Sequence, residues 1–206
     1  MVELASRDRP DVLCLQEVPV WAIPRLERWS GMKAYAAITR PACWPERVSA
    51  WVTQLHQGLF RSALAGQANA ILVRETHASE SLGHAQVSDS GRERRLVHAV
   101  RMDGLGVVAN LHLTNEFGRP EVPATEAERA REFAENLARP DEAVILAGDF
   151  NLLGFSLHGY SPGGAGIDHI FVRGAPFAEL TVWPVARRTY AGVVLSDHAP
   201  VERTIG

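Results

Sequence analysis

The stretch "AVILAGDFNLLGF" (residues 143–155) places an acid and an amide directly after an apolar run. Residues 143–147 carry no polar side chain, which predicts a buried strand. The chain then turns at Gly148 and presents Asp149 and Asn151 in quick succession. A carboxylate and a carboxamide at the end of a core strand are either turn formers or parts of a site. The choice between them depends on what other strands bring to the same place.

The composition is that of a folded domain. With 206 residues, the chain is long enough to bury a real core, and we expect residues 1–206 to form a single domain. Apolar residues make up 46% and charged residues 22%, which excludes a disordered chain. The net charge of -3 argues against a broad grip on nucleic acid, although a local basic patch is compatible with it. Cys14 and Cys43 do not make a disulfide framework, and we expect Cys14 to be a reduced core thiol.

Targeting signals are missing from the sequence as given. No apolar run approaches the length of a membrane helix. The opening "MVELASRDRPD" (residues 1–11) has neither the basic start nor the apolar middle of a signal peptide. We therefore expect no membrane span and a cytoplasmic protein.

Short apolar segments alternate with helical patterns and turn signals. Strands are predicted at 12–15, 34–39, 69–75, 143–147, 167–174, 179–183 and 200–205, with a hairpin over 95–113 that turns at Asp103 and Gly104. Helices are predicted before Pro10, over 45–66, and from a capping box at Thr125 and Glu128 to about Leu137. Strands mixed with helices predict an α/β or α+β fold, and the hairpins argue against a purely parallel sheet.

Polar side chains stand within or just after the apolar strands in five places. They are Glu17, Asn110 with His112, Asp149 with Asn151, Asp168, and Asp197 with His198. Each one alone is explained by a turn or by a histidine that packs in a core. Together they supply the carboxylates, imidazoles and carboxamide that a divalent-metal hydrolase uses.

Phosphate-ester hydrolysis would give these residue types a common purpose. Magnesium takes hard oxygen ligands, usually one or two carboxylates with waters and substrate oxygens, and Glu17 and Asp197 could supply them. The attacking water needs a proton acceptor, for which Asp149 and His198 are both candidates.

Two further functions remain for the other polar residues. Asn151 and His112 could donate hydrogen bonds to the negative charge that develops on the phosphoryl oxygens. An aspartate paired to a histidine fixes its tautomer and supports its charged form, and Asp168 with His198 could be that pair.

Five motifs follow one another along the chain: "DVLCLQEV" (11–18), "NLHLT" (110–114), "GDFN" (148–151), "IDHIFV" (167–172) and "SDHAPV" (196–201). This ordered set resembles the endonuclease/exonuclease/phosphatase superfamily, over about residues 4–205. That superfamily includes exonuclease III-like and apurinic endonucleases, pancreatic-type deoxyribonucleases, neutral sphingomyelinases, deadenylases and inositol polyphosphate 5-phosphatases. The resemblance implies a four-layered α/β/β/α sandwich, with two mixed sheets face to face, helices outside, and the site at one end.

The resemblance also implies roles for individual residues. Glu17 resembles the metal-holding glutamate, and Asp197 a further acid near the metal. Asp149 and Asn151 resemble the pair that activates water and contacts phosphate.

The remaining motifs have counterparts too. His112 is similar to the phosphate-contacting histidine of the sphingomyelinase-like branches. Asp168 resembles the partner of His198, and Asp149 and His198 both stay open as the general base.

The chain departs from the family pattern in two ways. Family members usually begin with a strand that ends in asparagine, whereas this chain starts inside the following helix, so that strand is absent. Either the true start lies upstream, or this version lacks a core strand and one site ligand. The second departure is the short connection over 151–168, which leaves little material for gripping duplex DNA.

The sequence therefore predicts a phosphoesterase that depends on Mg²⁺ (or Mn²⁺), with attack by an activated water and no covalent intermediate. Its substrate would be a phosphodiester in nucleic acid or lipid, or a small phosphomonoester. One alternative is a catalytically impaired family member that binds a phosphate ligand or a partner. The other is a plain structural domain, in which Glu17, Asp149 and Asp197 would lie far apart.

Two weaker signals stand outside the motifs. The basic residues Arg92, Arg94 and Arg95 precede a predicted strand, where they either steer phosphate or form a solvated hairpin end. The tryptophans Trp21, Trp29, Trp44 and Trp51 concentrate early in the chain, and we expect core packing rather than a stacking platform.

Overall fold

The computed structural model describes residues 1–55, 65–90, 93–116, 118–164 and 166–206. Its helices are α1 (Val2–Ser6), η1 (Val20–Arg25), α2 (Leu26–Ser30), α3 (Glu46–Leu55), α5 (Glu121–Leu137) and η2 (Val185–Arg188). Among the described residues, no helix is long and apolar enough to cross a membrane.

The strands form two principal sheets and two short ladders. The three-stranded sheet has the order β1 (Val12–Val18), β3 (Gln67–Arg74), β2 (Met32–Arg40). The five-stranded sheet runs β4 (Ser79–Gln86), β5 (Leu96–Met102), β6 (Gly106–His112), β7 (Ala143–Asp149), β8 (Asp168–Arg173). The short ladders pair β9 (Thr181–Val182) with β12 (Val201–Glu202), and β10 (Thr189–Tyr190) with β11 (Val193–Val194).

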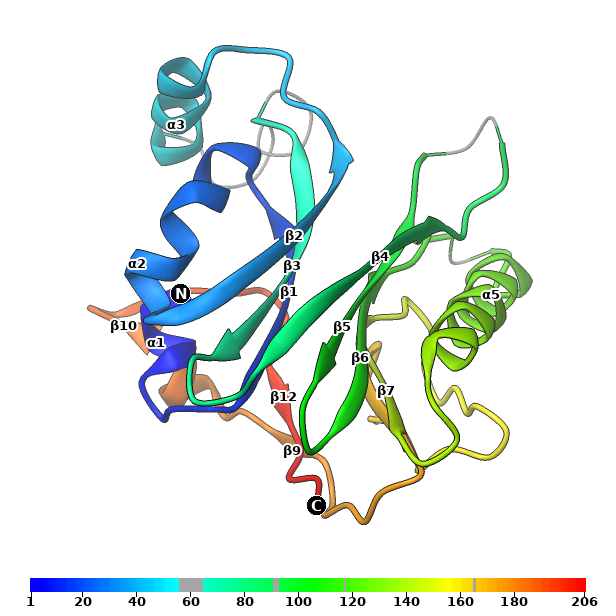
Figure 1. Ribbon diagram of the computed structural model, residues 1–206. Helices are drawn as coiled ribbons and strands as arrows, with labels where there is room; N and C mark the ends of the chain where they lie inside the picture. Colours follow the sequence, from blue (N-terminus) through cyan, green and yellow to red (C-terminus); the bar gives the residue numbers. More distant parts are fainter. Residues whose placement is uncertain (56–64, 91–92, 117, 165) are drawn as a thin grey trace.

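The two principal sheets face each other, with helices on their outer sides (Figure 1). Helices α1, α2 and α3 lie outside the three-stranded sheet, and α5 covers the five-stranded sheet. This confirms the predicted four-layered sandwich. In the five-stranded sheet only β6 and β7 are paired in parallel. The reason is that α5 lies between them in sequence, and parallel neighbours need such a crossover.

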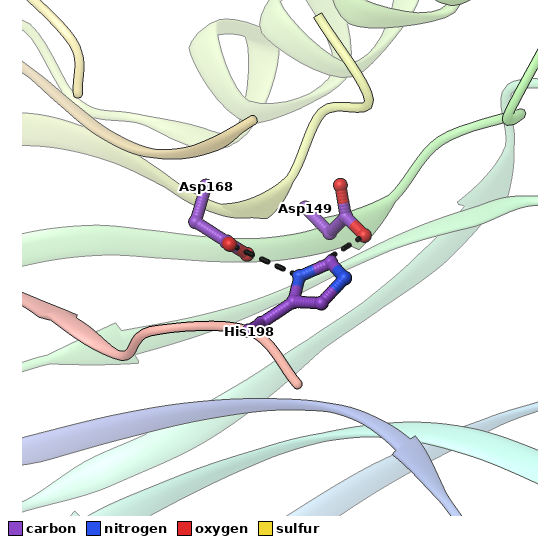
Figure 2. A group of neighbouring side chains, drawn as sticks. All are labelled: Asp149, Asp168 and His198. Carbon is purple, nitrogen blue, oxygen red and sulfur yellow. Dashed lines mark hydrogen bonds and ion pairs between the residues drawn. The ribbon is translucent and has the colours of Figure 1, made fainter. Parts of the chain in front are cut away.

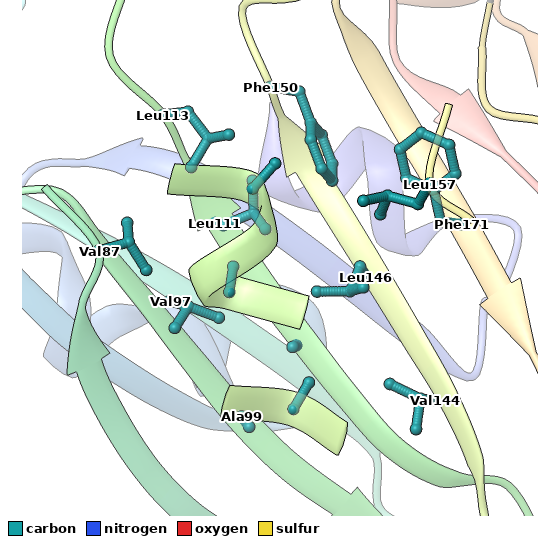
Figure 3. Close-up of a cluster of buried hydrophobic side chains, with 14 of the residues drawn as sticks. Val87, Val97, Ala99, Leu111, Leu113, Val144, Leu146, Phe150, Leu157 and Phe171 are labelled. Atoms are coloured by element: carbon teal, nitrogen blue, oxygen red, sulfur yellow. The ribbon is translucent and has the colours of Figure 1, made fainter. Parts of the chain in front are cut away.

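The core between α5 and the five-stranded sheet is built from alternate residues of the strands. Leu111 of β6 and Leu146 of β7 point to α5, and Phe150 and Phe171 close the cluster towards the end of β7 (Figure 3). Val107 of β6 belongs to the same cluster. The intervening residues face the three-stranded sheet, so both faces of β6 and β7 are buried. Strands buried on both faces are near-continuous apolar runs, which is why a polar residue in them stands out.

One expectation about helices needs correction, and a second is confirmed over the described residues. The predicted capping box at Thr125 is wrong, because α5 already begins at Glu121 and the Thr125 hydroxyl donates within the helix to the Glu121 carbonyl (2.8 Å). Prolines at 120 and 123 suit this start, since the first helical N–H groups have no acceptor. The predicted helix over 45–66 is confirmed as α3 up to Leu55, and its part over 56–64 lies outside the described residues.

The tryptophans divide into two pairs. The rings of Trp21 and Trp29 pack edge to face, with their centroids 6.2 Å apart. Both side chains pack on the hydrophobic cluster that lies on the helix-covered face of the three-stranded sheet. Trp44 and Trp51 are 43% and 61% exposed, so the expected core packing is wrong for these two. Helix α3 lies on the outer layer (Figure 1), where Trp51 is exposed to solvent.

Candidate active site

Three neighbouring strands place three of the predicted site residues in one row. His112 of β6 pairs directly with Asp149 of β7, and Asp149 pairs with Asp168 of β8. Directly paired residues point to the same face of a sheet. The row therefore lies side by side at the end of the strands, on the face turned towards the three-stranded sheet.

A glycine makes this row possible. Gly148 has φ 141° and pairs with Leu111, whose carbonyl oxygen would lie 2.0 Å from a Cβ at this position. Any side chain here would push β7 away from β6 and so separate Asp149 from His112. Gly148 thus allows β7 to approach β6 closely enough for the Asp149 carboxylate to lie beside His112.

Asp149 and Asn151 are locked together by hydrogen bonds. One Asp149 carboxylate oxygen accepts the backbone N–H of Asn151 (2.8 Å). The Asn151 carboxamide donates to the Leu113 carbonyl (2.9 Å), and the Leu113 N–H donates to the Asp149 carbonyl (2.9 Å). Asn151 has φ 53°, a conformation that asparagine tolerates better than most residues. The carboxamide also has a second N–H, which is a further potential donor.

His198 reaches the row from the loop after β11. Its Nδ1 lies 3.0 Å from an Asp168 carboxylate oxygen and 3.8 Å from an Asp149 oxygen (Figure 2). The same Asp149 oxygen, Oδ2, is also 3.6 Å from His112 Nε2. Asp149 therefore stands between two imidazoles, while Asp168 is the hydrogen-bond partner of His198.

Arg188 holds the loop that carries His198. Its guanidinium donates to the backbone carbonyls of Ser196 and of His198, which flank Asp197. Sequence reasoning missed this arginine, because nothing in "VARR" indicates which distant carbonyls it meets. Asp197 itself is exposed, and its carboxylate accepts the His198 N–H at 3.2 Å.

The pKa values of Asp149, His198 and His112 are shifted in different directions. Burial, with a smaller contribution from Asp168, raises the pKa of Asp149 to about 6. The hydrogen bond to Asp168 raises the pKa of His198 to about 9, so that imidazole is cationic at neutral pH. Burial, helped by the positive charge of Arg95, lowers the pKa of His112 to about 3 and keeps that imidazole neutral.

Glu17 stands on a bulge at the end of β1. Leu15 pairs with Ala70 and Val18 with Ala68, so β1 has one extra residue between these pairs. The extra residue puts Glu17 at φ 54°, one of four positive φ values among the described residues other than glycine. Such strained backbone often marks functional positions. The Glu17 side chain is exposed.

Asn110 connects the end of β1 to the five-stranded sheet. This fully buried carboxamide donates to the carbonyls of Leu15 and Ala70 (both 2.9 Å) and accepts from the Gln16 side chain (2.7 Å). It lies two residues before His112 on the same face of β6. A single residue of β6 thus fixes the strand end that carries Glu17 relative to the strand that carries His112.

The donor set fits a divalent cation. Within the described ranges, the one group of three or more potential ligands within 4.8 Å of one another is Asp149, Asp168 and His198. The two carboxylates are ligands that Mg²⁺ or Mn²⁺ prefers, whereas His198, cationic at neutral pH, is a hydrogen-bond donor in this group rather than a metal ligand. Glu17 and Asp197, the predicted metal ligands, stand outside this group, and their metal role stays a prediction.

The family comparison agrees with this geometry. The model of the Endonuclease/Exonuclease/phosphatase family matches residues 1–198. The chain belongs to this family. Membership makes it a phosphoesterase in the general sense, as the motif order predicted. No curated protein sequence matches the chain significantly.

Solved structures share the fold at low sequence identity. A functionally unknown conserved protein from Enterococcus faecalis V583 has a TM-score of 0.71 at 15% identity, over 100% of this chain and 90% of that chain. A mannosyl-6-phosphatase from Bacteroides thetaiotaomicron VPI-5482 gives 0.66 at 16%, over 100% and 90%. TDP2 from Caenorhabditis elegans gives 0.66 at 17%, over 99% and 66%. At these identities the likeness establishes the fold alone.

Proposed function

We propose that this protein is a divalent-metal-dependent phosphoesterase that hydrolyses a phosphodiester or a phosphomonoester by attack of an activated water. The main support is the group of Asp149, Asp168 and His198 at the end of the strand row, with His112 beside it. A carboxylate between two imidazoles, one of them paired to a second carboxylate, provides a proton acceptor and positive charge at one place.

Magnesium or manganese would be held by Glu17 and Asp197, with the Asp149 group beside it. When bound, the ion would neutralise charge on the phosphate and lower the pKa of a coordinated water. Asp149 and His198 are the two candidates for the proton acceptor, with His198 Nδ1 3.8 Å from an Asp149 oxygen. The raised pKa of His198 leaves it cationic at neutral pH, which favours Asp149 as the acceptor. The neutral His112 and the remaining Asn151 N–H would donate hydrogen bonds to the phosphoryl oxygens.

The ester preference is tested by comparing bis-(p-nitrophenyl) phosphate with p-nitrophenyl phosphate in the presence of Mg²⁺ or Mn²⁺. We expect turnover of at least one ester that disappears on chelation, and the preferred ester identifies the substrate class. No turnover with either ion would overturn the proposal and leave a family member that binds without hydrolysing.

The two proposed metal ligands are tested by calorimetric titration of Mn²⁺. Glu17→Gln and Asp197→Asn should each weaken Mn²⁺ binding about 10-fold or more, the scale for losing a charged ligand. Asp103→Asn, an exposed aspartate in the turn between β5 and β6, is the matched control and should bind as wild type does. Unchanged binding in Glu17→Gln would remove that residue from the metal site.

A further inference from the structure

Arg95 stands at the active-site end of the five-stranded sheet. It directly precedes β5, and its backbone is fixed on both sides by bonds to the Ser88 hydroxyl and the Val87 N–H (both 3.0 Å). Val97 pairs with Leu111 in the antiparallel β5–β6 ladder. The start of β5 therefore lies beside the end of β6, where His112 stands.

The Arg95 side chain is mostly buried and poorly paired. Its side chain is 12% exposed, and its Nε is buried without a hydrogen-bond partner among the described residues. The acid it meets is Glu93, at 2.9 Å, whose side chain is 52% exposed. An ion pair with so exposed a carboxylate is weak and is readily exchanged for a stronger anion.

The positive charge of Arg95 reaches the strand row. It lowers the pKa of His112 and, after the larger effects of burial and of neighbouring groups, the pKa of Asp149. The same end of the sandwich carries the carboxylates of Asp149 and Asp168, which repel a phosphate. A cation supplied by the protein at this place would offset part of that repulsion.

We propose that Arg95 binds the non-bridging oxygens of the substrate phosphate, which displaces Glu93 from the guanidinium. This inference rests on the proposed function. A guanidinium offers a planar fork of N–H donors that matches two phosphate oxygens, and a lysine lacks that fork. A phosphomonoester dianion gains more from this cation than a phosphodiester monoanion does, because the attraction scales with charge.

Binding of inorganic phosphate to the Mn²⁺-loaded protein, measured by calorimetry, tests the proposal without turnover. Arg95→Ala should raise the Kd of phosphate about 10-fold or more, the scale of one charge-assisted hydrogen bond. Arg95→Lys should lie between Arg95→Ala and wild type, and Glu93→Gln should lower the Kd because the competing carboxylate is gone. Arg94→Ala, which removes the neighbouring exposed cation, should stay within about twofold of wild type.

Kinetics provide the second readout. Arg95→Ala should raise KM more than it lowers kcat, and the rise should be larger for p-nitrophenyl phosphate than for bis-(p-nitrophenyl) phosphate. A thermal midpoint equal to that of wild type would show that the fold is intact.

A wild-type Kd for phosphate in Arg95→Ala would overturn the inference, as would a wild-type protein that binds no phosphate. Absence of turnover in the wild type would instead defeat the proposed function, and the phosphate Kd would still decide the role of Arg95.

Discussion

The two halves of the candidate site differ in what holds them. His112, Asp149 and Asp168 occupy paired positions of three adjacent strands, so the backbone ladder sets their spacing. Asp197 and His198 lie on a loop between two-residue ladders, where few backbone bonds restrain them. The strand half is held by the backbone hydrogen bonds of the sheet, whereas the loop half depends on individual side chains.

Burial shows the same contrast. Asp149 is 6% exposed, and its strand is buried on both faces. Beside the loop half, Tyr190 and Val193 are 66% and 55% exposed. Segments with little buried apolar surface open most easily, so the loop half is where the site would loosen first. The bond from His198 to Asp168 joins the two halves.

The largest expected effect comes from the strand half. Asp149→Asn should lower kcat about 1000-fold, because it removes the carboxylate between the two imidazoles. Its thermal midpoint should not fall, since burial already disfavours the charged form of this acid. Steady-state kinetics of Asp149→Asn are compared with those of wild type and of the control variant Asp103→Asn. A loss of kcat smaller than tenfold in Asp149→Asn would contradict a catalytic role for Asp149.

The next largest effect on kcat is expected from the hydrogen bond between His198 and Asp168, which joins the two halves. His198→Gln and Asp168→Asn should each lower kcat about 100-fold with the fold retained. Because the two residues act as a pair, the double variant should be hardly worse than either single one. A double-mutant cycle on kcat measures this, and fully multiplied losses would show that the residues act separately.

A smaller effect is expected from the support of the loop. Arg188→Gln removes the donors to the Ser196 and His198 carbonyls and should lower kcat about 10-fold, while KM changes little. Arg187→Gln is the matched control, because the neighbouring Arg187 pairs with Glu202 and Asp8 instead. Equal kcat values for the two variants would mean that Arg188 does not position the loop.

The last prediction concerns the stability of the five-stranded sheet rather than catalysis. His98 is buried between the sheets with neither ring nitrogen paired among the described residues, and burial, with His84 adding, lowers its pKa to about 4. Unfolding frees it to bind a proton below its ordinary pKa of 6.5. Stability should therefore fall as pH decreases from about 6.5 to about 4, by roughly 2 kcal/mol between pH 6.5 and 5.

Urea unfolding at several pH values measures that loss. His98→Leu should flatten the dependence over this range, because the titrating group is gone. A slope as steep as that of wild type would assign the acid sensitivity to other groups.

The strand half was largely predictable and the loop half was not. Apolar runs interrupted by polar residues mark β6, β7 and β8, since a buried strand has few other reasons to carry Asp149 or His112. The alignment of these residues in one row is a matter of register between distant strands, which local pattern does not encode. The polar edge strand β4 was missed for a related reason, because its half-exposed "SESLGHAQ" lacks an apolar alternation.

Side-chain partners were the hardest to foresee. Arg188 donates hydrogen bonds to two backbone carbonyls. Every residue has a backbone carbonyl, so the sequence does not indicate which ones an arginine will contact. Glu17 was found from its motif, but the bulge that presents it depends on how β1 pairs with β3. Long-range pairing, rather than residue type, decides both cases.

Metal-dependent ester hydrolysis at Asp149 is tested by restoring the metal to the wild type and to one variant. Turnover of the preferred p-nitrophenyl ester is followed in wild type and Asp149→Asn, first with chelator and then after Mn²⁺ is restored. We predict that Mn²⁺ restores turnover in wild type and not in the variant. Turnover that survives chelation, or that returns equally in Asp149→Asn, would contradict it.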